Sequence, residues 1–144
     1  MKIAVMSPRV NLVQAIDYPK RYLGIVVLIM LPVSLSYGAA PTWTIPDLLD
    51  IPVESVNTHN LFRAMMGLYL AFVAFWAYGY FQEKQRLTAI YTVIIFMLGV
   101  ASGRMLSMAL DGPPSPMLIF YTLSELTIGL TGVYLLYRRV NPYF

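Results

Sequence analysis

Residues Leu87–Leu110 read LTAIYTVIIFMLGVASGRMLSMAL, an apolar run with one charged residue, Arg104. A second run, Met117–Tyr137, also carries a single charge, on Glu125. Each run has the roughly 20 residues that a helix needs to cross about 30 Å of hydrocarbon. An ionisable group at the centre of such a helix costs about 2.5–3.5 kcal/mol on translocon scales, so it usually faces other helices and pairs. We therefore expect Arg104 and Glu125 to meet between neighbouring helices.

Two more runs have the length of a membrane span, Tyr22–Ala40 and Asn60–Phe81. Hydrophobic residues make up 58% of the chain and charged residues only 12%, which indicates an integral membrane protein and not a soluble globule. A longer loop, Pro41–His59, a tight turn, Gln82–Arg86, and the hexapeptide Asp111–Pro116 connect the runs, so sequential helices should be antiparallel neighbours. The sequence thus predicts an all-α fold, an integral membrane four-helix antiparallel bundle.

The bundle is expected to occupy residues 22–139, with no second domain. An N-terminal arm, residues 1–21, precedes it, and a tail, residues 140–144, follows it. Residues Met1–Tyr18 mix several apolar side chains with few charges. We expect this segment to lie at the membrane interface or on another subunit.

Basic residues mark one side of the predicted bundle. Eight of them fall before the first span, in the second connection and after the fourth span: Lys2, Arg9, Lys20, Arg21, Lys84, Arg86, Arg138 and Arg139. The charged residues in the loops on the opposite side are all acidic: Asp47, Asp50, Glu54 and Asp111. Because cytoplasmic loops are enriched in Lys and Arg, both termini are predicted to be cytoplasmic.

The first run has an alternative interpretation as a cleavable signal peptide. Gly38 and Ala40 place small residues where a signal peptidase reads them. The 21-residue lead before the run is long for the charged region of a signal peptide, which favours a retained span.

Small residues recur at helical spacing on two spans. Gly99, Gly103 and Ser107 stand four apart on the third, and Gly67 and Ala71 do so on the second. Small residues let helix backbones approach closely. We expect these faces to pack within one chain, since four helices joined by short loops need such contacts; a homodimer seam is the alternative.

Polar residues gather in the outer half of the predicted bundle. At about 1.5 Å rise per residue, Arg104 lies roughly 9 Å below Leu110 and Glu125 roughly 12 Å below Met117. Arg63 lies about one turn inside the second span, and Ser107 and Asp111 share a helix face with Arg104. His59 enters the membrane beside Arg63, together with Asn57 and Asn60.

Two interpretations of this cluster stay open. In the first, Arg63 and Arg104 neutralise Glu125 and Asp111 and so fix the order of the helices. In the second, the same groups line an outward-facing pocket, where Glu125 is a proton carrier or base and the arginines bind an anionic lipid or substrate.

The common catalytic templates are missing from the sequence. It has no phosphate-binding glycine loop, no His-Glu-x-x-His helix and no Gly-x-Ser-x-Gly elbow. The chain has no cysteine and a single histidine, so we expect no metal site and no cofactor. A net charge of +3 is explained by topology, and nucleic acid is not an expected partner.

The pattern of Arg63 with Gly67, then Arg104 followed by Asp111-Gly112-x-Pro114, then Glu125, resembles a bacterial family of small four-helix membrane proteins known only as a domain of unknown function. The resemblance covers about Tyr22–Tyr137 and implies the fold and a bacterial cytoplasmic (inner) membrane location, but no activity. From the missing templates we expect a non-enzymatic accessory subunit, with membrane lipids and other membrane subunits as partners. The alternative is a small membrane enzyme or transporter that uses Glu125, Arg63 and Arg104.

Overall fold

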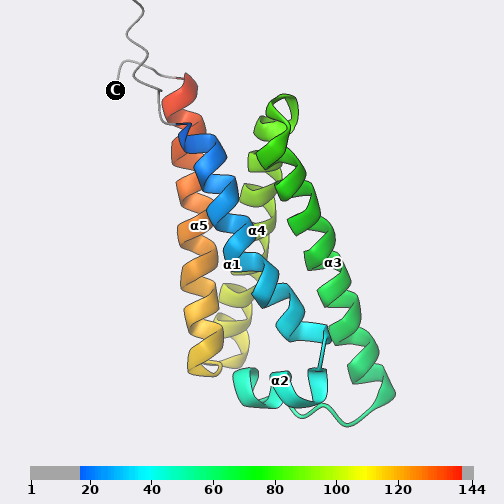
Figure 1. Cartoon of the computed structure of the whole chain (residues 1–144). Coiled ribbons are helices and arrows are strands. Elements are labelled where there is room, and N and C mark those ends of the chain that lie inside the picture. The colour runs from blue at the N-terminus through cyan, green and yellow to red at the C-terminus, as the bar shows by residue number, and fades with distance from the viewer. Residues whose placement is uncertain (1–16, 141–144) are drawn as a thin grey trace, which may run out of the picture.

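The computed structural model describes residues 17–140, and the regular secondary structure in this part of the chain is all helix (Figure 1). The predicted all-α bundle is therefore confirmed, whereas most of the predicted N-terminal arm and of the C-terminal tail lies outside the described residues. Four of the helices are long and apolar enough to span a membrane. The five helices in chain order are α1 (Tyr18–Gly38), α2 (Pro41–Leu49), α3 (Val56–Phe81), α4 (Glu83–Asp111) and α5 (Pro116–Val140).

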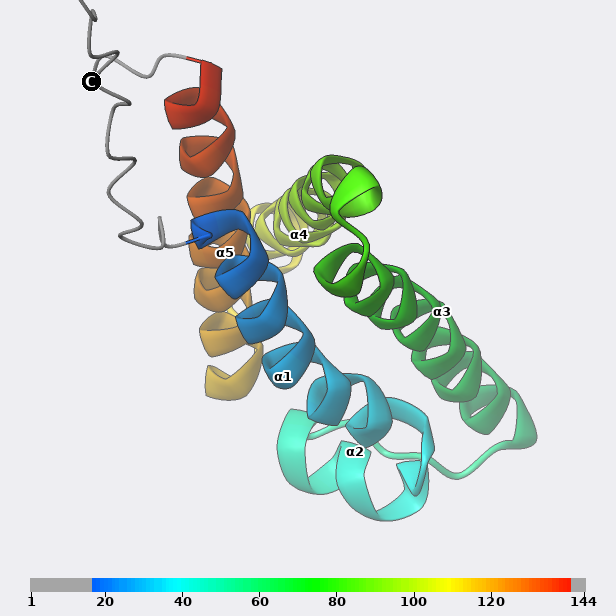
Figure 2. The same ribbon diagram turned by 45° about the horizontal axis from the view of Figure 1, so that its top comes forward.

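The four long helices form two closely packed pairs. Helix α1 packs most extensively on α3, and α5 packs on α4, while contacts between α3 and α4 join the pairs. Figure 2 shows that α3 and α4 lie close together at their connection and diverge toward the other end. Helices α1 and α5 touch less, and the Tyr22 hydroxyl links them by donating a hydrogen bond to the Ile128 carbonyl at 2.8 Å.

Helix α2 lies across one end of the bundle, where the sequence suggested only a loop (Figure 1). Pro41 occupies its first turn, a position that needs no backbone N–H donor, and Ile45 and Leu49 are buried against the long helices. Trp43 points outward with 75% of its surface exposed. We call this end the α2 end, and the opposite one, where Lys84 and Arg86 lie, the basic end.

The connections between spans are tighter than predicted. Gln82 alone separates α3 from α4, so Lys84 and Arg86 belong to the start of α4 and not to a turn. An ion pair between Arg86 and Asp17 joins the start of α4 to the start of α1. At the other end α4 stops at Asp111, as expected, and Gly112 follows with φ of 98°, which only glycine adopts easily.

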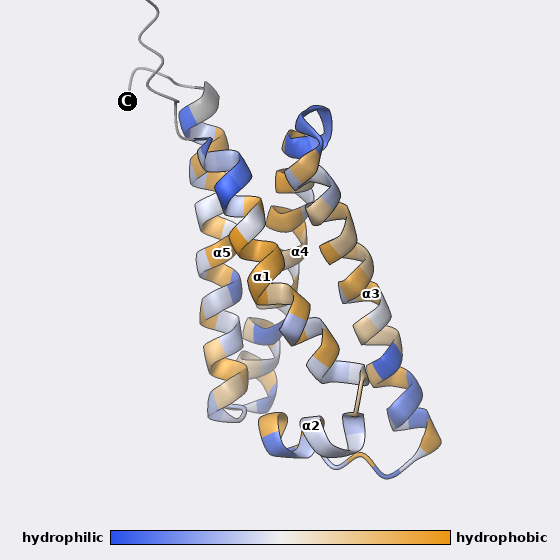
Figure 3. Ribbon diagram, viewed as in Figure 1, coloured by the Kyte–Doolittle hydropathy of each residue, from blue (hydrophilic) through white to orange (hydrophobic). Residues whose placement is uncertain are grey.

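Apolar residues form a band across the middle of the long helices, and polar residues concentrate at both ends (Figure 3). The core contains an aromatic group between α3 and α4. The Phe96 ring lies 4.8 Å from that of Tyr69 and 5.6 Å from that of Trp76, centroid to centroid. The fully buried Trp76 donates its indole N–H to Thr92 Oγ1 at 3.1 Å. These contacts fix the rotation of α3 against α4.

The small residues that bring the helices together are not the ones we expected. A Cβ added at Gly67, Gly99 or Gly103 would meet nothing within 4 Å, and Ala71 and Ser107 are exposed. The prediction that these faces pack within one chain is therefore wrong. The close approaches occur at other glycines, where an added Cβ would clash with a neighbouring helix: Gly38, Gly79, Gly129 and Gly132.

Replacing Gly38 with alanine should destabilise the bundle. The new Cβ would lie 2.7 Å from Met66 Cβ and 3.0 Å from the Arg63 Cα, so α1 and α3 would have to move apart. We expect a loss of about 1–3 kcal/mol, typical of overpacking. Unfolding in detergent would measure it. Gly99→Ala is the matched control, because open space surrounds Gly99, and a similar loss there would contradict this assignment.

Candidate functional site

The structure brings Arg104 and Glu125 together between α4 and α5. Arg104 Nε donates to both carboxylate oxygens of Glu125, at 3.2 Å and 3.1 Å. The two side chains are only 18% and 11% exposed. Their helices are joined by a four-residue connection, residues 112–115, which holds them in register. The pair thus places opposite charges in contact within the apolar part of the bundle, where each alone would be costly.

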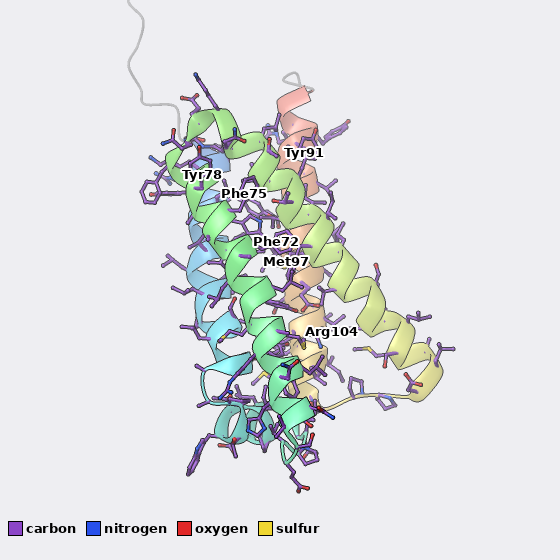
Figure 4. The ribbon with its side chains drawn as sticks, turned by 90° about the vertical axis from the view of Figure 1, so that its right-hand side faces the viewer. Phe72, Phe75, Tyr78, Tyr91, Met97 and Arg104 are labelled. Atoms are coloured by element: carbon purple, nitrogen blue, oxygen red, sulfur yellow. The ribbon has the colours of Figure 1, made fainter. Side chains whose placement is uncertain are left out.

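Two tyrosines complete the site, and the sequence analysis named neither. Arg104 Nη2 donates to the Tyr37 hydroxyl at 3.2 Å, and the Tyr121 ring centroid lies 6.0 Å from the guanidinium carbon. Figure 4 shows Arg104 on α4 at the level where α3 and α4 have separated. Tyr37 is 2% exposed and packs against Tyr69, with the ring centroids 5.3 Å apart. Three helices, α1, α4 and α5, therefore contribute to one polar network.

Helix length explains why Tyr37 reaches Arg104. Tyr37 is the second-last residue of α1, so the sequence suggests that it lies near the membrane surface. However, α1 has 21 residues where α3 has 26 and α4 has 29, and Gly38 lies against Arg63 and Met66 of α3, well inside the bundle. The end of α1 is thus at the depth of the ion pair, and α2 fills the space beyond it. A comparison of span lengths is the signal that points to Tyr37.

The remaining predicted members lie elsewhere. Ser107 donates to Asp111 at 2.9 Å on the exposed surface of α4. His59 joins α3 to α2, with Nε2 2.9 Å from Thr42 Oγ1 and Nδ1 2.9 Å from the Ser55 carbonyl oxygen. Arg63 is exposed on α3 and makes no ion pair with another residue in 17–140. The predicted cluster is therefore three separate polar groups and a solitary arginine.

The arrangement neutralises charge inside the bundle. One guanidinium N–H, on Nε, is shared between both oxygens of Glu125, and the Tyr37 hydroxyl accepts from another of the guanidinium donors. Within residues 17–140, no group of three His, Cys, Asp or Glu side chains lies close enough to hold a metal ion. What this site offers chemically is a fixed dipole between α4 and α5.

Residues 20–136 match the family described as Domain of unknown function (DUF4345). The chain belongs to this family. The match includes all of α3 and α4 and most of α1 and α5 of the DUF4345 chain, with Arg104, Glu125 and Tyr37. No curated protein and no solved structure matches the chain significantly.

The Arg104–Glu125 pair should show strong energetic coupling. Arg104→Leu or Glu125→Leu alone leaves an uncompensated charge, with an expected cost of about 3–5 kcal/mol, whereas the double variant removes both charges and should recover most of it. Unfolding of the four proteins in detergent gives the coupling energy. Arg63→Leu is the control and should change stability little. Additive losses in the double variant would show that the pair is not coupled.

Tyr37→Phe should weaken the network without breaking the pair. The substitution keeps the ring packed on Tyr69 and removes one hydrogen bond to the guanidinium, at a cost of about 1.5–3 kcal/mol for a charged partner. Tyr91→Phe provides the matched control, because Tyr91 is 50% exposed. Equal stability of the two variants would remove Tyr37 from the site.

Proposed function

We propose that the chain is a non-enzymatic accessory subunit that binds a membrane-spanning helix of another protein through small-residue faces on α3 and α4. The observation that carries this proposal is the lipid-facing surface of α3. Between Phe62 and Ala77 its exposed apolar residues are small except for Leu68: Ala64, Gly67, Ala71 and Ala74. Other spans present large side chains there, as α1 does with Ile25, Leu28, Leu31 and Leu35.

The α3 face points away from the bundle. Gly67 and Ala71 lie two residues to either side of the buried Tyr69, so each points about 160° from it at about 100° per residue. No atom lies within 4 Å of a Cβ placed at Gly67. Because lipid chains are as apolar as leucine side chains, helices associate in membranes mainly where small residues let their backbones approach. This face therefore suits a second helix.

The face of α4 that carries Gly99 and Gly103 also suits a partner helix, and it lies at a similar depth in the bundle. Gly103 lies about 12 Å and Gly67 about 16 Å from the helix ends at the α2 end, counted at 1.5 Å per residue. Gly99 and Gly103 are both exposed and surrounded by open space. A partner helix on either face would come close to the backbone at mid-span.

The internal ion pair favours an accessory role over an enzyme or transporter. A carboxylate that serves as a base or proton carrier needs a partner that exchanges protons. Glu125 instead has both oxygens on one guanidinium, which stays protonated in proteins. The pair balances its own charge within one chain and needs no charged ligand.

For localisation we propose a bacterial cytoplasmic membrane with the basic end in the cytoplasm. Lys20, Arg21, Lys84 and Arg86 lie at that end, together with Arg138. Asp47, Asp50 and Asp111 lie at the α2 end. This distribution has the sign that the positive-inside rule requires.

Gly67→Leu or Gly103→Leu should reduce complex formation about tenfold, since a leucine side chain keeps a partner backbone away. A photoreactive residue at exposed Leu68 would form a covalent adduct of defined mass with the partner in native membranes, and mass spectrometry after extraction in mild detergent would quantify it.

Ala109→Leu is the matched control, because Ala109 is also an exposed small residue but lies about 120° around α4 from Gly103. Its adduct should be unchanged. A lone monomer without any bound protein, or equal adducts in the Gly67 and Ala109 variants, would refute the proposed role.

A further inference from the structure

A groove of about 600 Å³ runs between α1 and α5, on a different side of the bundle from the small-residue faces. Its volume falls in the range of small-molecule sites. Its apolar walls come from both helices: Ile29, Met30, Val33, Phe120, Leu123 and Ile128. The groove exists because α1 packs mainly on α3 and α5 on α4, which leaves the seam between the first and last helices open.

Four polar side chains also line this groove, all on α5: Tyr121, Ser124, Glu125 and Thr127. The Ser124 hydroxyl donates to the Phe120 carbonyl at 2.9 Å, and the Thr127 hydroxyl donates to the Leu123 carbonyl at 2.8 Å. The hydrogens of both hydroxyl groups are thus used within the helix, and the oxygen lone pairs remain available to accept a hydrogen bond. The Tyr121 ring covers the Arg104 guanidinium.

Glu125 adds further acceptor capacity. A carboxylate has about four acceptor positions, and Arg104 Nε supplies a single N–H to the two oxygens. Ser124, Glu125 and Thr127 therefore present hydrogen-bond acceptors to a groove with apolar walls. A matching occupant has a hydrocarbon body and a small group that donates a hydrogen bond.

We propose that this groove binds a neutral lipid alcohol from the bilayer, with its hydrocarbon along α1 and α5 and its hydroxyl donating to Ser124 or Glu125. The charge of the site favours a neutral donor, because Arg104 already balances Glu125. A carboxylate or phosphate headgroup would face oxygen acceptors and lose hydrogen bonds. Glu125 lies about 14 Å from the start of α5, a depth that suits a small headgroup better than a phospholipid one.

The test uses the full chain in phosphatidylcholine nanodiscs and a sixteen-carbon alcohol with a diazirine in its chain. After illumination, mass spectrometry should find the label on peptides that contain residues 29–33 and 120–128. An excess of unlabelled hexadecanol should abolish that labelling. The methyl ether of the same probe keeps the chain but cannot donate, and it should label about fivefold less, the effect of one hydrogen bond.

Thr127→Trp places a large ring at an exposed position on the groove wall and should reduce labelling at least fivefold. Thr131→Trp is the matched control: Thr131 is also exposed, its hydroxyl also donates to the carbonyl four residues earlier, and it lies outside the groove. Ser124→Ala should weaken alcohol labelling while the thermal stability of the protein stays unchanged.

A diazirine sterol alcohol tests the shape of the hydrocarbon. Labelling by the linear alcohol, the sterol alcohol or both supports the proposal and identifies the body that fits. Equal labelling by the alcohol and its methyl ether, or by the Thr127 and Thr131 variants, would overturn it. None of these outcomes bears on the docking of a partner helix at α3, which involves different residues.

Discussion

The contact between Arg104 and Glu125 is the constraint on which the rest of the bundle depends. Hydrocarbon solvates neither charge, so both must stay in contact with an opposite charge. That requirement fixes the rotation of α4 against α5 and sets the depth of both helices. It also involves α1, because the Tyr37 hydroxyl accepts a hydrogen bond from the guanidinium. A single polar network thus specifies how three apolar helices are arranged, which apolar packing alone defines weakly.

The arrangement of the helices leaves distinct surfaces for lipid and protein. Close packing is concentrated in the pairs α1 with α3 and α4 with α5, where Gly38, Gly129 and Gly132 allow the backbones to approach. The opening between the pairs becomes the groove at the α1–α5 seam. The outward side of α3 is smooth around Gly67, and on α4 open space surrounds Gly99 and Gly103. The groove and the outward small-residue faces both follow from the pairing of α1 with α3 and of α4 with α5.

The sequence was sufficient to predict the four spans, because hydrophobic length is a direct consequence of bilayer thickness. It also pointed to Arg104 and Glu125, since charges in apolar runs are rare and tend to pair. It did not predict α2, because residues between Pro41 and His59 were expected to form only a connection. It assigned the small residues wrongly, because spacing shows that a helix face is smooth but not which neighbour covers it. Which helix covers a face depends on the angles at which the helices cross, and the tertiary packing of the bundle sets those angles.

The two residues of the ion pair lie on the last two helices to be synthesised, and this has a consequence for biosynthesis. Chains are made from the N-terminus, so Arg104 is synthesised, and reaches the membrane, 21 residues ahead of Glu125. At about 5–20 residues per second this interval lasts about one to four seconds. During that time α4 carries an unbalanced positive charge, and only the arrival of α5 neutralises it. Helices α4 and α5 should therefore pack together as one hairpin, and a ribosome stalled between them would leave the Arg104 charge on α4 without its partner.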